Sequence, residues 1–434
     1  MESPATNPEM IHVVCKADNR QHAVVKIPPS LDHNLPSLSL RARPILLGLT
    51  SNNLSYARGG DLLHWWKTYP VPPTAPAPYN DQSSWGIVPA WGYATVTESN
   101  VPGITPESLI WGYWPTSTLP TLLRLERSDP EGHWVEVSSH RQQLMPIYNR
   151  YEWVLPNEEE EELDKRAWST VFQGVWVAGY LLSEYVFSPN PRAQEPVHPL
   201  GAASKLPWSA DDADLSSAVI VVLGASTKVA RSFSWCLFNR ARESGPLGLV
   251  QVTSSSSPSV LQEVADRKGW GCVSKILAYT EINQATEWIE GLQPSKVVII
   301  DCGARDNVLS QICQNIQESA LQSCKTVILQ VGSQQKVYTA DEVQAARAAM
   351  QLLGKIQYNT SGIQDTVINR EGAATYFGKV SHRWKEWLAH RASAIPDMRL
   401  VFGQGIAGEN GIYGGWEKLS NGAVRPEEGL VYAL

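Results

Sequence analysis

The chain has 434 residues, which exceeds the usual size of one domain and predicts at least two. Apolar residues make up 43% and charged residues 18%, a composition that supports sizeable cores and excludes a disordered chain. The net charge of −7 lacks the basic footprint of a nucleic-acid-binding protein and disfavours anionic membranes. We therefore expect neither nucleic acid nor a membrane among its partners.

The cysteines and the N-terminus indicate the compartment. The six cysteines, at positions 15, 236, 272, 302, 313 and 324, form no CxxC pair, which is typical of reduced thiols in a cytosolic protein. The first ten residues contain no basic segment followed by an apolar core, so no secretory signal is expected. Residues 171–187 are strongly apolar but too short to span a bilayer, and they predict a buried helix. We expect a cytoplasmic protein.

Residues 1–155 predict a barrel-like β domain, because short β-prone runs alternate there with turn signals. The runs cover residues 11–14, 23–27, 44–49, 109–113 and 134–137. The proline-rich residues 70–78 predict an extended loop, since proline cannot donate to a sheet ladder. A helix is expected from about Leu163, and residues 188–216 read as a connector.

From residue 217 the pattern changes to apolar runs that alternate with amphipathic stretches. Strands are predicted at residues 218–223, 247–252, 274–279, 296–301 and 326–331, and helices at 228–243, 257–268, 283–291 and 307–321. Such spacing implies right-handed βαβ units, so the fold class is α/β with a doubly wound parallel sheet. Further helices are expected at residues 340–353 and 372–391, and the glycine-rich end, 400–434, is expected to return to the first domain.

The turn after the first strand of this sheet is a candidate phosphate loop. Gly224 ends the strand, Ser226 and Thr227 follow, and a helix is predicted to begin at Lys228. Amides at a helix N-terminus, together with two hydroxyls, form a natural site for a pyrophosphate. The usual GxGxxG spacing is absent, and Ser226 or Thr227 could equally be a plain N-cap.

The second strand ends at Thr253 and Ser254, where an NAD-binding domain would carry a carboxylate for the ribose 2′-OH. Its absence favours a 2′-phosphate, and hence NADPH, with Lys228 and Arg231 as the nearest candidate cations. The serines that follow Thr253 could also form a plain loop.

Other motifs add one candidate and exclude several. Gly303 follows Asp301 at the end of the fourth strand, where ligands of such sheets gather, although Asp301 could only cap the next helix. A stricter GxGxxG match at residues 403–408 lies outside any predicted βαβ unit, and no helical pattern follows it, so we interpret it as a chance match. No zinc-site spacing and no GxSxG elbow occurs, so neither a metal nor a hydrolase triad is expected.

Four further segments of the first domain form recognisable motifs: residues 49–57 (LTSNNLSYA), 85–92 (WGIVPAWG), 110–115 (IWGYWP) and 148–151 (YNRY). Together these motifs resemble a family of unknown function related to zinc-free medium-chain dehydrogenases and reductases of the quinone-oxidoreductase and enoyl-reductase type. Residues 224–230 resemble the family's phosphate loop, Ser-Ala-Ser-Ser-Lys-Thr-Ala, and retain Lys228. They depart from it at Gly224, Thr227 and Val229, and the last change removes a hydroxyl.

The resemblance implies an architecture and a set of site residues. It implies a GroES-like barrel at residues 1–163, a connecting helix and linker at 164–216, a Rossmann domain at 217–335 and a returning segment at 336–434, with the active cleft between the two domains. Asn53, Tyr56, Tyr148, Asn149 and Tyr151 match family motif positions. Each could polarise a substrate carbonyl or be a structural hydrogen-bonding residue. Dimerisation is common in the superfamily, so the resemblance allows a homodimer.

Three hypotheses about function follow. The first is an NADPH-dependent, zinc-independent reductase of an apolar conjugated carbonyl compound such as an enone or quinone, in secondary metabolism. The second is a non-redox enzyme, a cyclase, isomerase or pericyclase, that keeps the cleft but has a degenerate cofactor loop; the loop and the 17 tryptophans motivate it. The third is an inert scaffold or binding protein.

Overall fold

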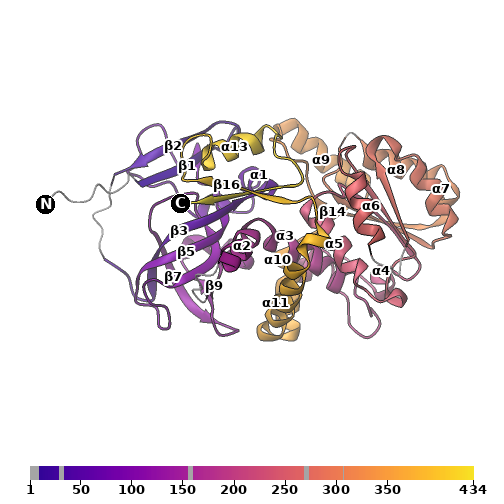
Figure 1. Cartoon of the computed structure of the whole chain (residues 1–434), viewed down its shortest axis with the longest axis horizontal. Coiled ribbons are helices and arrows are strands. Elements are labelled where there is room, and N and C mark those ends of the chain that lie inside the picture. Colours follow the sequence, from indigo (N-terminus) through magenta and orange to yellow (C-terminus); the bar gives the residue numbers. More distant parts are fainter. Residues whose placement is uncertain (1–8, 29–33, 155–159, 268–272, 306) are drawn as a thin grey trace. The chain divides into compact units, whose positions relative to one another are not determined.

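The computed structural model describes residues 9–28, 34–154, 160–267, 273–305 and 307–434. They form two compact units, coloured along the chain in Figure 1. The first unit comprises Met1–Gly174, Gln335–Tyr338 and Arg399–Leu434, and the second comprises Val175–Gln334 and Thr339–Met398. No helix among the described residues is long and apolar enough to cross a membrane.

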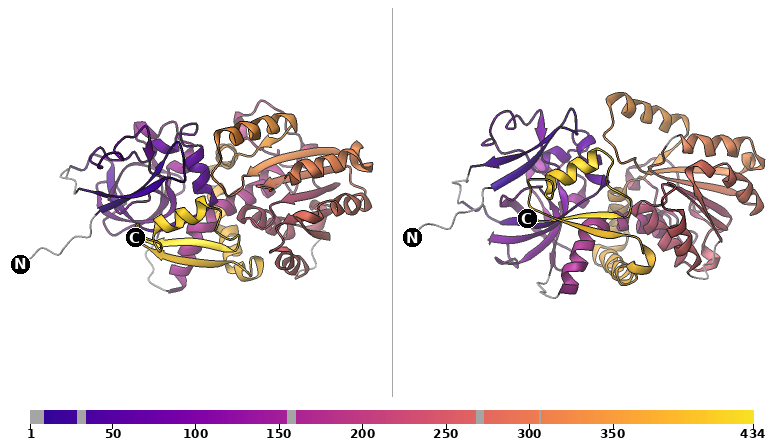
Figure 2. Two further views of the ribbon diagram at one scale, coloured as in Figure 1. Left: turned by 90° about the horizontal axis from the view of Figure 1, so that it is seen from above. Right: turned by 45° about the horizontal axis from the view of Figure 1, so that its top comes forward.

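The first unit is built around a closed barrel. Strands β3, β5, β6, β9, β8 and β7 pair in this order, and β3 also pairs with β7, which closes the ring seen in the left view of Figure 2. The predicted GroES-like barrel is confirmed. The strands of this unit are β1 (Glu9–Cys15), β2 (His22–Ile27), β3 (Ser39–Leu49), β4 (Trp85–Gly86), β5 (Ala90–Ser99), β6 (Leu109–Trp114), β7 (Thr121–Ser128), β8 (His133–Glu136), β9 (Arg150–Val154), β16 (Arg399–Gln404) and β17 (Glu428–Ala433).

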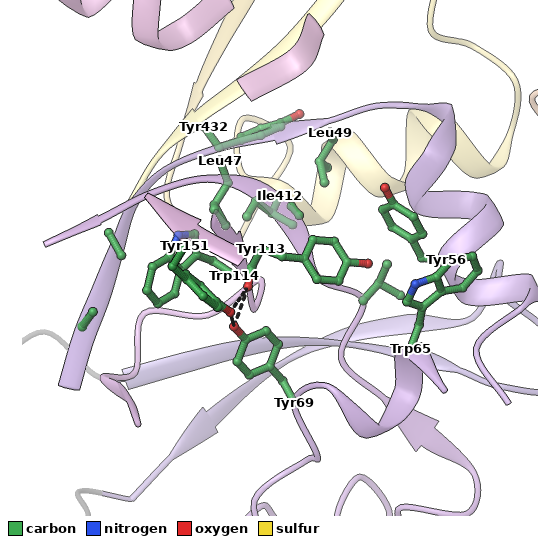
Figure 3. Packing of buried hydrophobic residues seen from close by; sticks show 14 of the residues in the cluster. Leu47, Leu49, Tyr56, Trp65, Tyr69, Tyr113, Trp114, Tyr151, Ile412 and Tyr432 are labelled. Atoms are coloured by element: carbon green, nitrogen blue, oxygen red, sulfur yellow. Dashed lines mark hydrogen bonds between the residues drawn. The ribbon is translucent and has the colours of Figure 1, made fainter. Parts of the chain in front are cut away.

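Helices and a small sheet complete this unit. Strands β2, β1 and β4 form a separate three-stranded sheet, and β17 extends the barrel sheet by pairing with the second half of β3. The helices are α1 (Ser51–Arg58), α2 (Glu160–Trp168) and α13 (Ile412–Ser420), with 3-10 turns at Trp65–Lys67, Ser139–Arg141 and Pro146–Asn149. Figure 3 shows the core that the barrel and the C-terminal segment build together from side chains such as Leu47, Ile412 and Tyr432.

The second unit contains the parallel sheet, with the strand order β12-β11-β10-β13-β14-β15. This is the order of a Rossmann domain, so the predicted fold class is confirmed. Each predicted strand agrees with the structure to within one residue at either end. The strands are β10 (Ala218–Leu223), β11 (Gly248–Thr253), β12 (Val273–Ala278), β13 (Lys296–Cys302), β14 (Lys325–Gly332) and β15 (Ile356–Gln357).

Helices connect these strands. The described ones are α3 (Gly174–Leu181), α4 (Ala210–Ala213), α5 (Lys228–Phe238), α6 (Pro258–Asp266), α7 (Gln284–Gly291), α8 (Val308–Gln317), α9 (Ala340–Leu352), α10 (Thr360–Glu371), α11 (Ala373–Ala389) and α12 (Arg391–Ala394). Helices α7 and α8 bury one face of the sheet, where Ile289 and Ile312 pack with Val219 and Val297. The predicted helix at 257–268 ends at Asp266, and Lys268 lies outside the described residues.

The predicted boundaries of the connecting helix and the C-terminal segment differ from the observed division. The expected buried helix runs continuously through two π-helical turns, Ser169–Gln173 and Leu182–Val186, which flank α3, and the unit boundary falls after Gly174. Residues 339–398 belong to the second unit rather than the first. The reason is local packing: the Trp384 ring lies 5.6 Å from that of Trp176, and the Tyr358 hydroxyl donates to Ala178 O at 2.6 Å.

Candidate functional site

The carboxyl edge of the parallel sheet brings the predicted cofactor residues together. Gly224 follows β10, Thr253 ends β11 and is followed by Ser254, and Gly303 follows β13. Because β10 lies between β11 and β13, these three turns are neighbours in space. Ligands of doubly wound sheets bind at this edge, near the strand at which the order reverses.

The turn after β10 has the backbone that a phosphate loop needs. Gly224 has φ +75°, a left-handed conformation in which an added Cβ would meet Cys302 O at 3.2 Å. Its amide and that of Ala225 both donate to Val252 O at 3.0 Å, which holds the turn against the end of β11. Thr227 is the N-cap of α5, since its hydroxyl accepts from Ala230 N. The first amides of α5 have no partner within the helix, as at any helix N-terminus.

Arg231 does not serve as a cation for a 2′-phosphate, which corrects the prediction. Its Nε donates to Ser226 O at 3.1 Å, and its two terminal nitrogens bind the carboxylate of Asp397 at 2.5 and 2.8 Å. The side chain is almost fully buried. Arg231 therefore holds the backbone of the loop in place. Of the two predicted cations, the half-buried Lys228 is the one that still fits the binding of a 2′-phosphate.

At the end of β11, Thr253 and Ser254 lie as predicted but differ in environment. The Thr253 side chain is buried, and its hydroxyl has no hydrogen-bond partner among the described residues. The Ser254 hydroxyl forms a hydrogen bond with the Ser256 hydroxyl, at an oxygen–oxygen distance of 3.0 Å. An orphaned buried hydroxyl at this edge of the sheet is unusual, since buried polar groups nearly always find a partner.

The turn after β13 is held by Asp301. One carboxylate oxygen accepts from the amides of Gly303 at 3.0 Å and Ala304 at 2.9 Å, and the other lies 3.5 Å from Lys355 Nζ. Gly303 has φ +102°, and a Cβ there would lie 2.6 Å from Ser333 O. Asp301 thus caps this turn, the alternative that the sequence left open, and Lys355 is a supporting residue that sequence reasoning missed.

The prediction that residues 403–408 lie outside any βαβ unit is wrong. Residues 403–408 begin with the last two residues of β16 and lead toward α13. Strands β16 and β17 are parallel neighbours, so the loop does lie in a βαβ unit. Its chemistry is nevertheless different from that of a phosphate loop. The amides of Ile412, Tyr413 and Gly414 at the start of α13 donate to the loop's own carbonyls at 2.9–3.1 Å. These amides are already engaged within the loop.

In the first unit, Tyr56 and Tyr148 belong to one aromatic cluster, with ring centroids 5.7 Å apart. Trp91 Nε1 donates to the Tyr56 hydroxyl at 3.2 Å, and the Tyr148 ring also packs against that of Trp65, with centroids 5.6 Å apart. Burial raises the pKa of Tyr56 to about 12, and burial followed by the nearby Tyr56 raises the pKa of Tyr148 well above 10. Both phenols are therefore protonated donors at neutral pH.

Tyr151 lies elsewhere, inside the barrel. Its hydroxyl accepts from Arg141 at 2.9 Å, pairs with the Tyr69 hydroxyl at 2.9 Å and reaches Tyr113 O, as the dashed lines of Figure 3 show in part. The guanidinium of Arg141 is buried, with Glu136 at 3.8 Å. Tyr151 therefore stabilises a buried charge.

The two predicted asparagines act within the fold. Asn53 Oδ1 accepts from Thr50 N at 2.7 Å in a capping box, and its Nδ2 donates to Pro89 O at 2.9 Å. Asn149 Nδ2 donates to Arg141 O at 3.1 Å. Their amides are used in holding the chain, which favours the structural alternative. Among the described residues, no group of three or more His, Cys, Asp or Glu side chains could hold a metal ion.

A family model described as "Protein of unknown function (DUF2855)" matches residues 47–425. The chain belongs to this family. No curated protein matches the sequence.

Several solved structures have the same fold as this chain. CurA from Vibrio vulnificus in complex with NADPH is 10% identical, with a TM-score of 0.51 and 98% of each chain covered. The Etr1p/NADP/crotonyl-CoA complex is 9% identical, with a TM-score of 0.51 over 99% of this chain and 100% of that one. The mitochondrial 2-enoyl thioester reductase Etr1p/Etr2p heterodimer from Candida tropicalis is 10% identical, with a TM-score of 0.52 over the same shares. At such identities the likeness shows the fold.

Proposed function

We propose that this protein is a zinc-independent, NADPH-dependent reductase of a conjugated carbonyl compound, an enone or a quinone, in a secondary-metabolite pathway. The observation that carries the proposal is the carboxyl edge of the sheet. There a left-handed Gly224 turn, the Gly303 turn and the orphaned hydroxyl of Thr253 lie side by side. CurA with NADPH and Etr1p with NADP share this fold, which supports the cofactor.

Different residues at this edge of the sheet would bind different parts of the dinucleotide. The Gly224 turn and the first amides of α5 would hold the pyrophosphate, with the Ser226 backbone fixed by Arg231. Lys228 would bind the 2′-phosphate, and no carboxylate ends β11 to select a free 2′-hydroxyl. NADPH, when bound, supplies the hydride.

The aromatic cluster supplies the polar donor. An indole N–H can only donate, so Trp91 gives its hydrogen to the Tyr56 oxygen. The ring of Tyr148 packs edge-on against that of Tyr56, with centroids 5.7 Å apart, which limits the orientations of Tyr56. The Tyr56 hydrogen is then left for a substrate carbonyl, whose developing negative charge it would stabilise. We propose Tyr56 as the donor and Tyr148 as the residue that orients it.

Calorimetric titration of the purified protein with NADPH and NADH tests the cofactor. We expect NADPH to bind more tightly, and Lys228→Ala to weaken NADPH while leaving NADH nearly unchanged. The exposed Lys205→Ala in the same unit is the matched control. Absence of heat with NADPH would contradict the proposal.

Kinetics with a cyclic enone tests the donor. Tyr56→Phe should lower kcat about 10²- to 10³-fold without changing the affinity for NADPH. Tyr148→Phe should have a smaller effect on kcat, because it keeps the ring that packs against Tyr56. Conversion of a candidate substrate in the absence of NADPH would instead favour the non-redox hypothesis.

We further propose a cytoplasmic homodimer. The solved Etr1p/Etr2p heterodimer, which has the same fold, supports a two-chain assembly. Light scattering coupled to size exclusion should give twice the mass of the chain, and a single-chain mass at micromolar concentration would contradict the dimer.

A further inference from the structure

The turns that follow β13 and β14 are in contact at the carboxyl edge of the parallel sheet. A Cβ added to Gly303, in the first turn, would lie 2.6 Å from Ser333 O in the second. Gln334 Nε2 donates to Ala304 O at 2.6 Å and joins the same two turns. The two strands are parallel neighbours, so both turns leave the sheet on one side. A group bound at the first turn would therefore also lie next to the second.

Lys355 joins these two turns from a third segment of the chain, just before the edge strand β15. Its Nζ donates to Gln330 Oε1 at 2.9 Å and lies 3.5 Å from Asp301 Oδ2. Asp301 lies near the end of β13, and Gln330 near the end of β14. The side chains of Lys355 and Asp301 are only 10% and 7% exposed. Because a lysine is rarely buried to this extent without a partner, we attribute its position to this pairing.

The charge of Lys355 keeps the Asp301 carboxylate in place. The second oxygen of this carboxylate accepts from the amides of Gly303 at 3.0 Å and Ala304 at 2.9 Å. An uncompensated buried charge is costly, so without Lys355 the carboxylate would move toward water. That movement would release both amides and let the turn change shape. Lys355 thus fixes the backbone of this turn from a distance.

The order of the strands indicates which part of a dinucleotide this turn would meet. In a doubly wound sheet of this order, the turn after the first strand holds the pyrophosphate, and the end of the second strand meets the adenosine ribose. Strands β11 and β13 flank β10 on opposite sides. The nicotinamide half would then extend over β13 and β14, away from β11. The turn that Lys355 fixes lies on that side.

We propose that Lys355 is a positioning residue for the nicotinamide half of NADPH. It acts through Asp301 and Gln330, which belong to the ends of β13 and β14, rather than by touching the cofactor. This inference rests on the proposed function and assigns one half of its cofactor to a named support. The adenosine half, bound at β11 and the Gly224 turn, does not depend on Lys355.

Calorimetry of Lys355→Met with two ligands tests this division. NADPH contains both halves, whereas adenosine 2′,5′-bisphosphate contains only the adenosine half. The substitution should weaken NADPH about 10-fold, the low end for loss of a hydrogen bond to a charged group, and leave the bisphosphate nearly unchanged. A general loosening of the unit would weaken both ligands alike. The control is Lys325→Met, which removes a lysine paired with Asp212 at the other end of β14 and should change neither affinity.

A double variant and hydrogen exchange separate the charge of Lys355 from the stability of the unit. Asp301→Asn with Lys355→Met leaves no charge buried and keeps an oxygen that can accept from both amides. This double variant should bind NADPH more tightly than Lys355→Met alone. In Lys355→Met the amides of Gly303 and Ala304 should exchange faster than in the wild type, while that of Gly224 should not.

The outcomes distinguish this inference from the reductase itself. Wild-type affinity for NADPH in Lys355→Met, or an equal loss of NADPH and the bisphosphate, would overturn the role of Lys355 and leave the reductase standing. Absence of NADPH binding by the wild type would refute the reductase and the inference together.

Discussion

Replacing Asp397 by asparagine should destabilise the second unit and loosen the phosphate loop together. Asp397 and Arg231 form a two-pronged ion pair at 2.5 and 2.8 Å, with side-chain exposures of 21% and 4%. The same guanidinium holds Ser226 O through its Nε. The substitution keeps the shape of the side chain and removes its charge, so Arg231 is left buried without a counter-charge.

The magnitude follows from the burial of the pair. Removing one partner of a buried ion pair lowers the free energy of unfolding by about 3–5 kcal/mol. Because Asp397 is partly exposed, water offsets some of this loss, and we expect the lower end, about 3 kcal/mol. Replacing both residues by apolar ones of similar size, Arg231→Met with Asp397→Leu, should destabilise less than Asp397→Asn alone, because no charge is then left buried.

The pH dependence has a definite sign. Burial by itself would raise the pKa of Asp397, but hydrogen bonds from Arg231 and its positive charge outweigh burial, so the net shift is downward. A carboxyl with a lowered folded-state pKa stabilises the fold fully above its unfolded value, about 4. That contribution is lost as the pH falls through the lower, folded-state pKa.

Urea unfolding followed by circular dichroism measures these changes, with NADPH calorimetry in parallel. We expect a lower midpoint for Asp397→Asn at pH 7, a smaller difference from the wild type below pH 3, and weaker binding of NADPH. An unfolding midpoint equal to that of the wild type at pH 7 would refute the argument that Asp397→Asn leaves the positive charge of Arg231 buried without a counter-charge.

Three further substitutions test other features. Tyr151→Phe removes a hydroxyl that binds the buried Arg141, and should lower the free energy of unfolding by about 2 kcal/mol in urea titrations. Gly303→Ala forces a Cβ into a left-handed backbone against a carbonyl oxygen, and should destabilise by about 1–3 kcal/mol and weaken NADPH binding. Burial raises the pKa of Glu152 to about 7, although the positive charge of Arg150 acts in the opposite direction. The free energy of unfolding should therefore fall by about 2 kcal/mol as the pH rises from 4.5 to 7, because the folded state disfavours the ionised carboxylate. Glu152→Gln should flatten that pH profile in urea titrations.

The parallel sheet could be predicted in detail because its signals are local. The run at β10 is apolar at every position, and all six of its residues are buried from both sides. The helices were less accurate at their ends: α5 stops at Phe238, five residues before the predicted end, where Asn239 caps it. Helix boundaries depend on capping contacts that the hydrophobic period does not encode.

The candidate site could be predicted in part, for a related reason. Tyr56 and Tyr148 were found through motif resemblance, and the structure brings them together. The contacts that decide the role of a side chain often join residues far apart in the sequence. Arg231 and Asp397, for example, are separated by 166 residues. The alternation of Trp91 with Tyr93 could have placed both rings on one face of their strand, but the closeness of Trp91 to Gly174 needs the tertiary structure.

A comparison of the loop after β10 with residues 403–408 shows why glycine spacing alone is a weak guide to nucleotide binding. The loop at residues 403–408 satisfies the GxGxxG spacing and enters a helix, yet three amides at the start of α13 bond to the loop's own carbonyls. The loop after β10 has one glycine. Its Gly224 and Ala225 amides donate to Val252 O, and its Thr227 amide donates to Gly224 O. An anion binds amides that have no other partner, which disfavours residues 403–408 as a phosphate site. The loop after β10 stays the proposed site because it lies at the carboxyl edge of the parallel sheet, where ligands of such sheets bind.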